Sequence, residues 1–270
     1  MGISSRGEAT PLVLAIETST VLLGVSVVAG NRVVYETALE RPRVHSKMLL
    51  PLCIEALDAV GVSREDLSCI AVSAGPGSFT GLRIGCATAQ GLGFSLGITV
   101  VLVPTFEVYL YQCLHLDAVA IVQGKARGQT VCALYVRETR GPSGQEGFWG
   151  RYGYREAITI GPDDFSRFYV EILKRVPSAE TTWVAGDAAA EFCDEVLKMR
   201  ERFIRGEALP EIERLVEVRP VDEYWRLPRP GIVGLIGSRM FLEGKGQPPS
   251  LALPQYYRKS QAEAAFGNRT

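Results

Sequence analysis

The sequence predicts an α/β protein of two lobes, in which mixed β-sheets are flanked by helices. Three apolar runs rich in β-forming residues, at 12–17, 23–28 and 32–39, are separated by short turns, and this spacing is typical of an antiparallel meander. A helix, a strand, a second helix and a further strand follow, and helical crossovers join parallel strands. A chain of 270 residues suits one large domain or two lobes and is long enough to bury a sizeable core.

The first helix is predicted over 45–60, where apolar residues recur at helical spacing and charged residues occupy the opposite face. Ser46 is the expected N-cap, and Gly61 is expected to end the helix. Ser63 and Asp66 have the spacing of a capping box and indicate a short turn after the helix.

The next segment is predicted to be a strand–loop–helix unit. A buried strand over 69–73 leads through the glycine-rich loop 75–81 into a helix over 82–96, for which Thr80 is the expected cap. Another buried strand is predicted over 98–103. The resulting order β-β-β-α-β-α-β is the signature of the ribonuclease-H-like lobe found in sugar kinases, actin and the 70-kDa chaperones.

The rest of the chain is expected to form a smaller second lobe and then to return to the first. Strands are predicted over 118–123, 129–137, 157–160 and 183–187, and helices over 165–174 and 188–199. The expected boundaries are 11–107 for the N-terminal lobe, completed by a helix at 230–245, and 108–229 for the second lobe, with flexible tails at 1–10 and 259–270.

Composition excludes several classes of protein. Hydrophobic residues make up 47% and charged residues 22% of the chain, which are ordinary values for a globular protein. The net charge of −1 gives no sign of the basic domain that an independent nucleic-acid binder usually has. The six cysteines form no C-x-x-C pair and are expected to be reduced, in a cytoplasmic protein. No secretory leader is expected, and the apolar stretch 91–103 is too short to span a membrane.

The turn after the first strand carries an acidic residue, Glu17, followed by the hydroxyl residues Thr18 and Ser19. In phosphotransferases of this fold an acidic residue ends that strand, and the hydroxyl turn approaches phosphate or its metal. A single carboxylate holds hydrated Mg²⁺ poorly without a second carboxylate or bound phosphates. Two interpretations therefore stay open, a nucleotide-proximal turn and a hydroxyl-rich hairpin turn with a structural role.

Two glycine-containing junctions are further candidates for a nucleotide-proximal site. In the first, Gly75, Gly77 and Gly81 would let a ligand or another chain approach the backbone, but their spacing matches neither G-x-G-x-x-G nor the P-loop. A tight, packed connection is the alternative. In the second lobe, Gly186 and Asp187 end a strand at a junction that often meets the nucleotide in this fold class, and an Asp N-cap is the alternative.

The sequence contains no recognisable set of catalytic or metal-binding residues. Its two histidines, His45 and His115, are far apart, and neither an H-E-x-x-H pair nor a Cys/His cluster occurs. There is no G-x-S-x-G nucleophile elbow. We therefore expect no catalytic residue and no metal ligand, and we expect an enzyme-like fold that serves as an assembly partner.

The helices predicted over 45–60 and 82–96 are unusually apolar, which leaves two interpretations. One is burial against the sheet of the same lobe, and the other is a helix-mediated interface with a partner or a second copy. The residues expected at such an interface are His45, Met48, Leu49 and Leu52 on the first helix and Gly85, Ala89 and Gly93 on the second.

Five segments together resemble one family. They are Leu14-Ala-Ile-Glu-Thr-Ser19, His45-Ser-Lys-Met-Leu-Leu-Pro51, Ala74-Gly-Pro-Gly-Ser-Phe-Thr-Gly-Leu-Arg-Ile-Gly85, Val103-Pro-Thr-Phe-Glu107 and Ala185-Gly-Asp187. The sequence is similar to the TsaB (YeaZ) family, the bacterial partner in making threonylcarbamoyladenosine on tRNA. The strong match covers roughly the first 107 residues, and its third segment is highly specific.

The resemblance implies an ASKHA fold, the fold of the actin-like ATPases, with two related lobes. It implies that the chain pairs through its N-terminal lobe with the catalytic homologue TsaD, joins the ATPase TsaE in a larger complex, and forms a homodimer when alone. TsaD transfers the threonylcarbamoyl group to the tRNA adenosine and carries a metal-binding histidine pair, which this chain lacks. The chain would bind no cofactor tightly, any ATP, ADP or Mg²⁺ would be bound within the complex, and tRNA contact would be indirect.

One departure from the family concerns the first hairpin of the second lobe, where acidic residues are frequent. Lys125 and Thr130 occupy those positions here, so no role of the carboxylates carries over. The terminal Pro-x-Tyr-x-Arg pattern persists at Pro254-Gln-Tyr256-Tyr257-Arg258.

The expected function is that of a non-catalytic subunit required for threonylcarbamoyladenosine modification, which binds and activates TsaD. The alternative is a small-molecule kinase or ATPase of the same fold acting alone, which would need a second catalytic acid near Glu17. A glycopeptidase activity is disfavoured by the missing histidine pair.

Overall fold

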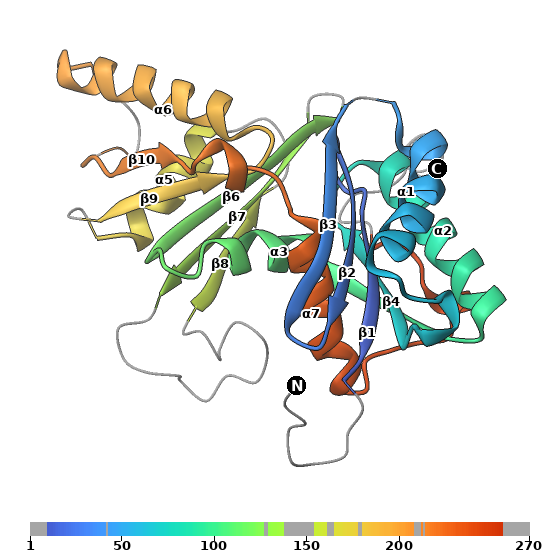
Figure 1. Cartoon of the computed structure of the whole chain (residues 1–270). Helices are drawn as coiled ribbons and strands as arrows, with labels where there is room; N and C mark the ends of the chain where they lie inside the picture. Colours follow the sequence, from blue (N-terminus) through green and yellow to red (C-terminus); the bar gives the residue numbers. More distant parts are fainter. Residues whose placement is uncertain are drawn as a thin grey trace, which may run out of the picture. The chain divides into compact units, whose positions relative to one another are not determined.

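The computed structural model describes residues 10–41, 43–126, 129–137, 154–160, 165–177, 180–207, 212 and 214–255. The chain divides into two compact units (Figure 1). Unit 1 contains the residues up to Thr105 and those from Arg229 onward, and unit 2 runs from Phe106 to Pro228. Apart from Thr10, the expected tails lie outside the described residues, as do the tyrosines and the arginine of the terminal pattern.

Unit 1 is built on a five-stranded sheet with the order β3-β2-β1-β4-β5. Its strands are β1 Leu12–Glu17, β2 Leu22–Ala29, β3 Arg32–Glu40, β4 Cys69–Gly75 and β5 Thr99–Pro104. β2 pairs antiparallel with β1 and β3, whereas β4 lies parallel to β1 and β5. The predicted meander followed by parallel strands is therefore confirmed.

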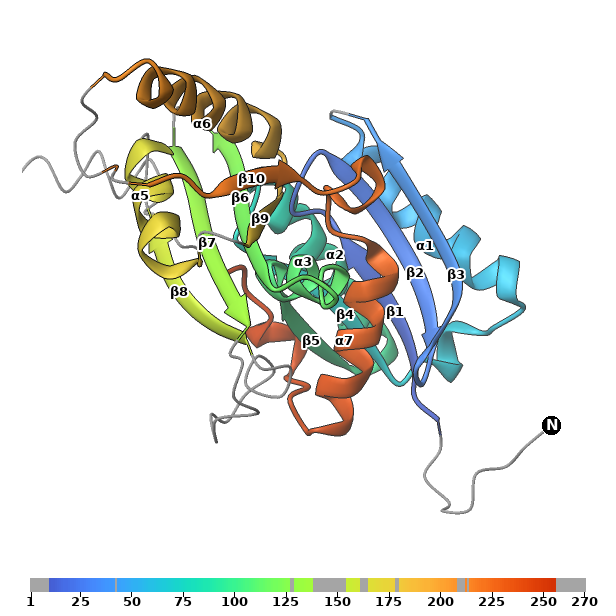
Figure 2. The same cartoon turned by 90° about the vertical axis from the view of Figure 1, so that its left-hand side faces the viewer.

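Helices cover both faces of this sheet. They are α1 His45–Val60, α2 Phe79–Leu96 and α7 Pro230–Leu242. α1 and α2 pack on one face, and α7 packs on the other (Figure 2). Successive residues of β1 point to opposite faces, so Leu14 and Ile16 join the core under α1 and α2 while Ala15 lies against α7. Burial on both faces explains why β1 is continuously apolar rather than alternating.

α7 approaches the sheet closely because small residues line both surfaces. A Cβ added at Gly234 would lie 3.1 Å from the Ser26 hydroxyl oxygen, and one added at Gly237 would overlap the side chain of Ala71. Ser26 also donates a hydrogen bond of 2.8 Å to the carbonyl oxygen of Pro230 at the start of the helix. The glycines of α7 thus allow the C-terminal part of the chain to complete the unit that the N-terminal strands begin.

Unit 2 contains a second five-stranded sheet with the order β10-β9-β6-β7-β8. Its strands are β6 Ala118–Ala126, β7 Gln129–Arg137, β8 Tyr154–Ile160, β9 Thr181–Ala185 and β10 Glu217–Pro220, and the helices are α3 Thr105–Gln112, α5 Phe165–Arg175 and α6 Ala189–Ile204. α5 and α6 cover one face, where the rings of Phe168 and Phe192 lie 5.4 Å apart, and α3 covers the other. The predicted fold class, two mixed five-stranded sheets flanked by helices, is therefore confirmed.

The start of α1 differs from the predicted one. Its N-cap is Val44, whose carbonyl oxygen accepts hydrogen bonds of 3.0 and 2.9 Å from the amides of Lys47 and Met48. The expected cap, Ser46, therefore lies inside the first turn, and its prediction was wrong. Gly61 ends the helix in the left-handed conformation with φ 65°, as predicted from its freedom at positive φ.

The start of α2 also lies earlier than predicted. The helix begins at Phe79 rather than Leu82, and its cap is Ser78, not Thr80. The Ser78 hydroxyl accepts a hydrogen bond of 3.2 Å from the Gly81 amide, which satisfies one of the unpaired donors of the first turn. The glycines made this stretch resemble a loop, although packing requires them inside the helix. The short elements α3 and β10 were not predicted at all.

Most of the residues expected at a partner interface lie inside unit 1. The buried positions are His45, Leu49, Leu52, Gly85, Ala89 and Gly93. Leu49, Leu52 and Ala89 belong to the core that α1 and α2 form with the sheet. Leu49, Leu52 and Ala89 therefore serve the core of unit 1, and the partner interface expected at the seven residues stays a prediction. Met48, which is 37% exposed, is the one residue of the expected set that faces solvent.

We predict that Gly85→Ala lowers the free energy of unfolding by about 2 kcal/mol, because the added methyl group would overlap the buried Thr18 hydroxyl. Gly91→Ala in the same helix is the matched control. No atom lies within 4 Å of a Cβ added there, so this variant should gain up to about 1 kcal/mol from helix propensity. Urea unfolding followed by circular dichroism measures both. Wild-type stability of Gly85→Ala with an altered oligomeric state would show that this face is an interface.

Candidate functional site

The acid turn after β1 lies beside the end of β4. Because β1 and β4 are parallel neighbours, Glu17 at the end of β1 comes close to Ser73 near the end of β4. The Oε1 atom of Glu17 accepts hydrogen bonds from the amide and from the hydroxyl of Ser19, both of 2.6 Å. Its Oε2 atom accepts a hydrogen bond from the Ser73 hydroxyl. Both carboxyl oxygens are thus bound by neighbouring residues of unit 1.

The surroundings of Glu17 are closed to solvent. The residue is 0% exposed, and burial raises the pKa of Glu17 to about 7, although the hydrogen bonds from Ser19 and Ser73 act in the opposite direction. A carboxylate that holds Mg²⁺ must be reached by the ion together with several of its waters. The geometry therefore favours the structural interpretation of this turn over a metal-binding or phosphate-binding one.

The glycine-rich loop packs directly onto the acid turn. A Cβ added at Gly77 would overlap the carbonyl oxygen of Ser19, and one added at Gly81 would overlap the carbonyl oxygen of Thr18. The Ser78 amide donates a hydrogen bond of 2.6 Å to the Ser19 carbonyl oxygen. Glycine is needed at these positions because two stretches of backbone touch. The tight, packed connection is therefore the interpretation that the geometry supports.

The structure thus brings most of the predicted nucleotide-proximal residues to one place. They are Glu17, Thr18, Ser19, Gly75, Gly77 and Gly81. Sequence reasoning missed Ser73, which completes the hydrogen bonding of Glu17. The signal that could have identified it is a hydroxyl in the otherwise apolar run of β4, immediately before the glycine-rich loop.

The other two predicted nucleotide-proximal residues lie in unit 2, at the end of β9. Gly186 has φ 114°, and its amide donates a hydrogen bond of 3.0 Å to the Arg226 carbonyl oxygen. The Asp187 carboxylate accepts a hydrogen bond from the Gly124 amide of β6, and burial raises the pKa of Asp187. The N-cap of α6 is Ala188, so the alternative of an Asp187 N-cap is wrong. The Asp187 side chain instead joins the ends of β6 and β9.

The β6–β7 hairpin carries the two positions at which the family's acidic residues are replaced. Thr130 is buried on β7, in a place where an ionised carboxylate would pay for its desolvation. Lys125 is part of β6, and its side chain lies outside the described part of the chain.

The described residues offer no other reactive centre of a common kind. No group of three or more His, Cys, Asp or Glu side chains within the described ranges could hold a metal ion. All six cysteines are buried and free, and burial raises the pKa of Cys53 and Cys86 to about 12, so neither is an activated thiolate at neutral pH. Across the part of the chain that the structure describes, no helix is both long enough and apolar enough to cross a membrane.

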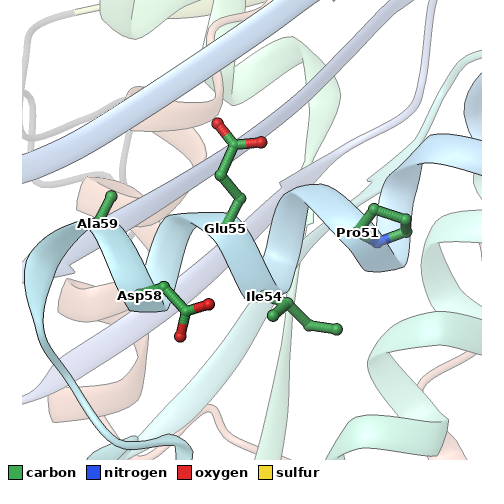
Figure 3. A pocket seen from close by; sticks show the side chains of 5 residues that line it. All are labelled: Pro51, Ile54, Glu55, Asp58 and Ala59. Carbon is green, nitrogen blue, oxygen red and sulfur yellow. The ribbon is translucent and has the colours of Figure 1, made fainter.

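The outer side of α1 is a candidate for recognition rather than for chemistry. Pro51, Ile54, Glu55, Asp58 and Ala59 line a shallow depression of about 690 Å³ (Figure 3). In the view of Figure 3 the Glu55 side chain points up from the helix and the Asp58 side chain points down. Glu55 accepts a hydrogen bond of 3.0 Å from the Tyr35 hydroxyl of β3. The large apolar residues that α1 exposes are Met48, Leu50 and Ile54.

Comparison with known proteins relates the chain to one biosynthetic system. Residues 39–140 match the family model described as TsaD, tRNA N6-adenosine threonylcarbamoyltransferase. The tRNA threonylcarbamoyladenosine biosynthesis protein TsaB of Bacillus subtilis is 33% identical over 124 residues, and that of Escherichia coli is 37% identical over 93 residues. These alignments cover 46% and 34% of this chain and 54% and 40% of the relatives. The chain thus matches about half, or less, of the length of these relatives.

Solved structures extend the likeness to almost the whole chain. YeaZ from Pseudomonas aeruginosa matches with a TM-score of 0.63 and 22% sequence identity, over 91% of this chain and 99% of that one. At this identity the match shows the fold. The two mixed five-stranded sheets, one in each unit and both flanked by helices, define a two-unit α/β protein. Among proteins of that type, the chain resembles the TsaB (YeaZ) proteins, and the resemblance predicted from the sequence motifs is confirmed.

We predict that Glu17 makes stability fall as the pH rises from about 4.5 to about 7. The raised pKa means that the folded state binds more protons than the unfolded state in this pH range. The contribution of Glu17 to the free energy of unfolding is therefore fully present below the unfolded-state pKa, and it is lost as the pH rises through the folded-state pKa. The free energy of unfolding should fall by about 3 kcal/mol over this pH range. Glu17→Gln keeps an acceptor but does not titrate, so its denaturant midpoint should change less over this range. Parallel pH profiles of the two proteins would contradict the assignment.

Proposed function

We propose that the chain is a non-catalytic subunit required for the N6-threonylcarbamoyladenosine modification of tRNA, and that it binds and activates a TsaD-type catalytic subunit. The observation that carries this proposal is the similarity of the chain to TsaB proteins. The closed acid turn supports a role without chemistry, since both oxygens of Glu17 are bound within unit 1.

The exposed side of α1 is the surface that we assign to the catalytic subunit. Part of unit 1 matches the TsaD family model, so both partners would carry related units that can pair through equivalent surfaces about an approximate twofold axis. Met48, Leu50 and Ile54 supply exposed apolar area, and Glu55 and Asp58 border it. An apolar centre with a polar rim is the usual composition of such interfaces. In the absence of the partner, the same surface would form a homodimer.

The remaining assignments of the proposal follow from the pathway. A TsaE-type ATPase would join the pair in a larger complex, and ATP or ADP with Mg²⁺ would be bound within that complex rather than tightly by this chain. The net charge of −1 supplies no general attraction for tRNA phosphates, so tRNA would be contacted indirectly. The complex would work in the cytoplasm, without association with a membrane.

We predict that Ile54→Asp weakens binding to the TsaD-type subunit at least about tenfold, because it places a charge in the apolar centre of the proposed interface. Ile54 is 54% exposed, so the fold should tolerate the change. Ile204→Asp on α6 of unit 2 is the matched control, since Ile204 is 73% exposed and lies outside the proposed surface. Biolayer interferometry with the purified catalytic subunit measures both variants. Equal affinity of the two variants would remove α1 from the interface.

The activity itself is tested by reconstitution. The purified TsaD-type and TsaE-type proteins, an adenylate donor and unmodified tRNA are incubated with or without this chain, and the modified nucleoside is quantified by mass spectrometry. We expect product to depend on the chain. An unchanged rate in its absence would overturn the proposal.

The rival function, a kinase or ATPase acting alone, requires nucleotide binding by the isolated chain. The enclosure of Glu17 does not favour it, because a catalytic acid must reach the metal or the substrate. Isothermal titration with ATP and Mg²⁺ separates the two functions. Micromolar binding together with turnover by the isolated chain would support the rival.

A further inference from the structure

The residues after α7 form a strap along unit 1, defined here as residues 246–255. The strap first pairs with the free edge of β5, where the amides and carbonyl oxygens of Val100 and Gln247 exchange hydrogen bonds of 2.9 and 3.0 Å. It then crosses α2 so closely that a Cβ added at Gly93 would lie 2.9 Å from the ring of Pro249. Ala252 is fully buried in the core under α1 and α2. The first two-thirds of the strap is therefore built into the unit.

The outer end of the strap reaches the glycine-rich loop. The Gln255 amide donates a hydrogen bond of 2.7 Å to the carbonyl oxygen of Ala74. A Cβ added at Gly75 would lie 2.5 Å from the Gln255 carbonyl oxygen, and Gly75 has φ 121°. Gly75 is thus a glycine for two reasons, since its backbone is left-handed and the strap lies where a side chain would be.

A continuous series of backbone contacts leads from the strap to the buried acid. Gln255 binds the residue before Gly75, the same loop reaches Ser19 through the Ser78 amide, and the Ser19 amide binds the carboxylate of Glu17. The three hydrogen bonds are 2.7, 2.6 and 2.6 Å long in this order, and the backbone of residues 74–78 joins the first to the second. We propose that the outer end of the strap is a latch, which holds the glycine-rich loop closed over Glu17 and whose release opens that site.

The contacts of the strap indicate that its outer end can detach by itself. Leu251 and Leu253 on either side of Ala252 are exposed, and Gln255 is exposed as well. Ala252 and Gln247 can keep the inner part in place while the hydrogen bond from Gln255 to Ala74 breaks, which within the described residues is the one backbone hydrogen bond from 253–255 to another part of unit 1. Local opening of this kind draws on segments that have few buried contacts. The proposal concerns access to the Glu17 site and does not depend on a partner protein.

The latch is tested by removing one donor. Gln255→Pro deletes the amide that binds Ala74 and keeps the carbonyl oxygen and the rest of the strap. We expect amide hydrogen exchange at Ser78 and Ser19 to become about fivefold faster or more, as the loss of one hydrogen bond implies, while amides at the centre of β2 keep their rates. Leu253→Ala is the matched control, because it alters an exposed side chain of the same segment. It should leave the rates at Ser78 and Ser19 unchanged.

Titration of the Glu17 carboxyl group, followed by carbon-13 NMR, gives a second readout. An opened loop admits water, so the titration midpoint should move down from near neutrality toward the ordinary value of a glutamate. A Gln255→Pro protein with wild-type exchange at Ser78 and Ser19 would overturn the latch. So would equally accelerated exchange throughout unit 1, since this would make the strap a general clamp.

A second pair of variants decides the matter if Gln255→Pro does not fold. Chains that end after Gln255 or after Pro254 differ by the one residue that binds Ala74. Faster exchange at Ser78 in the shorter chain alone supports the latch, whereas identical exchange in the two chains overturns it. Unfolding of the shorter chain alone also overturns it, because the outer end would then be needed for the fold itself.

Discussion

The structure of unit 1 depends on a contact between two stretches of backbone, the turn after β1 and the first turns of α2. Side chains are excluded from this contact at Gly77, Gly81 and Gly85, where a Cβ would overlap Ser19 or Thr18. The contact lets α2 start directly above the end of β1. It also encloses Glu17, whose hydrogen bonds to Ser19 and Ser73 then fasten the turn to β4. The position of α2 and the burial of the acid are therefore consequences of one close approach.

The order of the elements could be predicted because it is encoded locally. Apolar periodicity and turn residues identified the meander, α1 and α2, and the parallel pairing of β1 with β4 follows from the helical crossover. That pairing brings the acid turn beside the glycine-rich loop, two features that the sequence presented as separate candidates. α3 and β10 were missed because eight and four residues are too few for periodicity to be distinctive. The early start of α2 was missed because its glycines serve a contact that no local pattern shows.

The direction in which each apolar helix faces could not be predicted. α1 carries apolar residues on two sides, and periodicity identifies only the larger set, which includes Leu49 and Leu52. The structure shows that this set packs on the sheet of unit 1, while Leu50 and Ile54 face solvent. The partner surface that we propose therefore lies among the exposed residues that interrupt the main apolar stripe rather than among those that form it. The glycines of α7 present the same difficulty, since the residues they contact are about 130–220 positions away in the sequence.

The surroundings of Glu17 explain how unit 1 can bury an acidic residue. Enclosing an ionised carboxylate away from water costs several kcal/mol unless a cation or sufficient hydrogen bonds compensate. Here the pKa of about 7 allows protonation near neutrality, and the hydroxyl and amide donors of Ser19 and Ser73 compensate the ionised form in part. The protonated acid can therefore lie beneath a closed loop at little cost, whereas its ionised form lowers the free energy of unfolding by about 3 kcal/mol. Closure of the loop over the acid also gives a closely packed junction between the end of β1 and the start of α2. That junction holds α2 and the adjoining α1 in place, and with them the outer side of α1 that we propose for recognition.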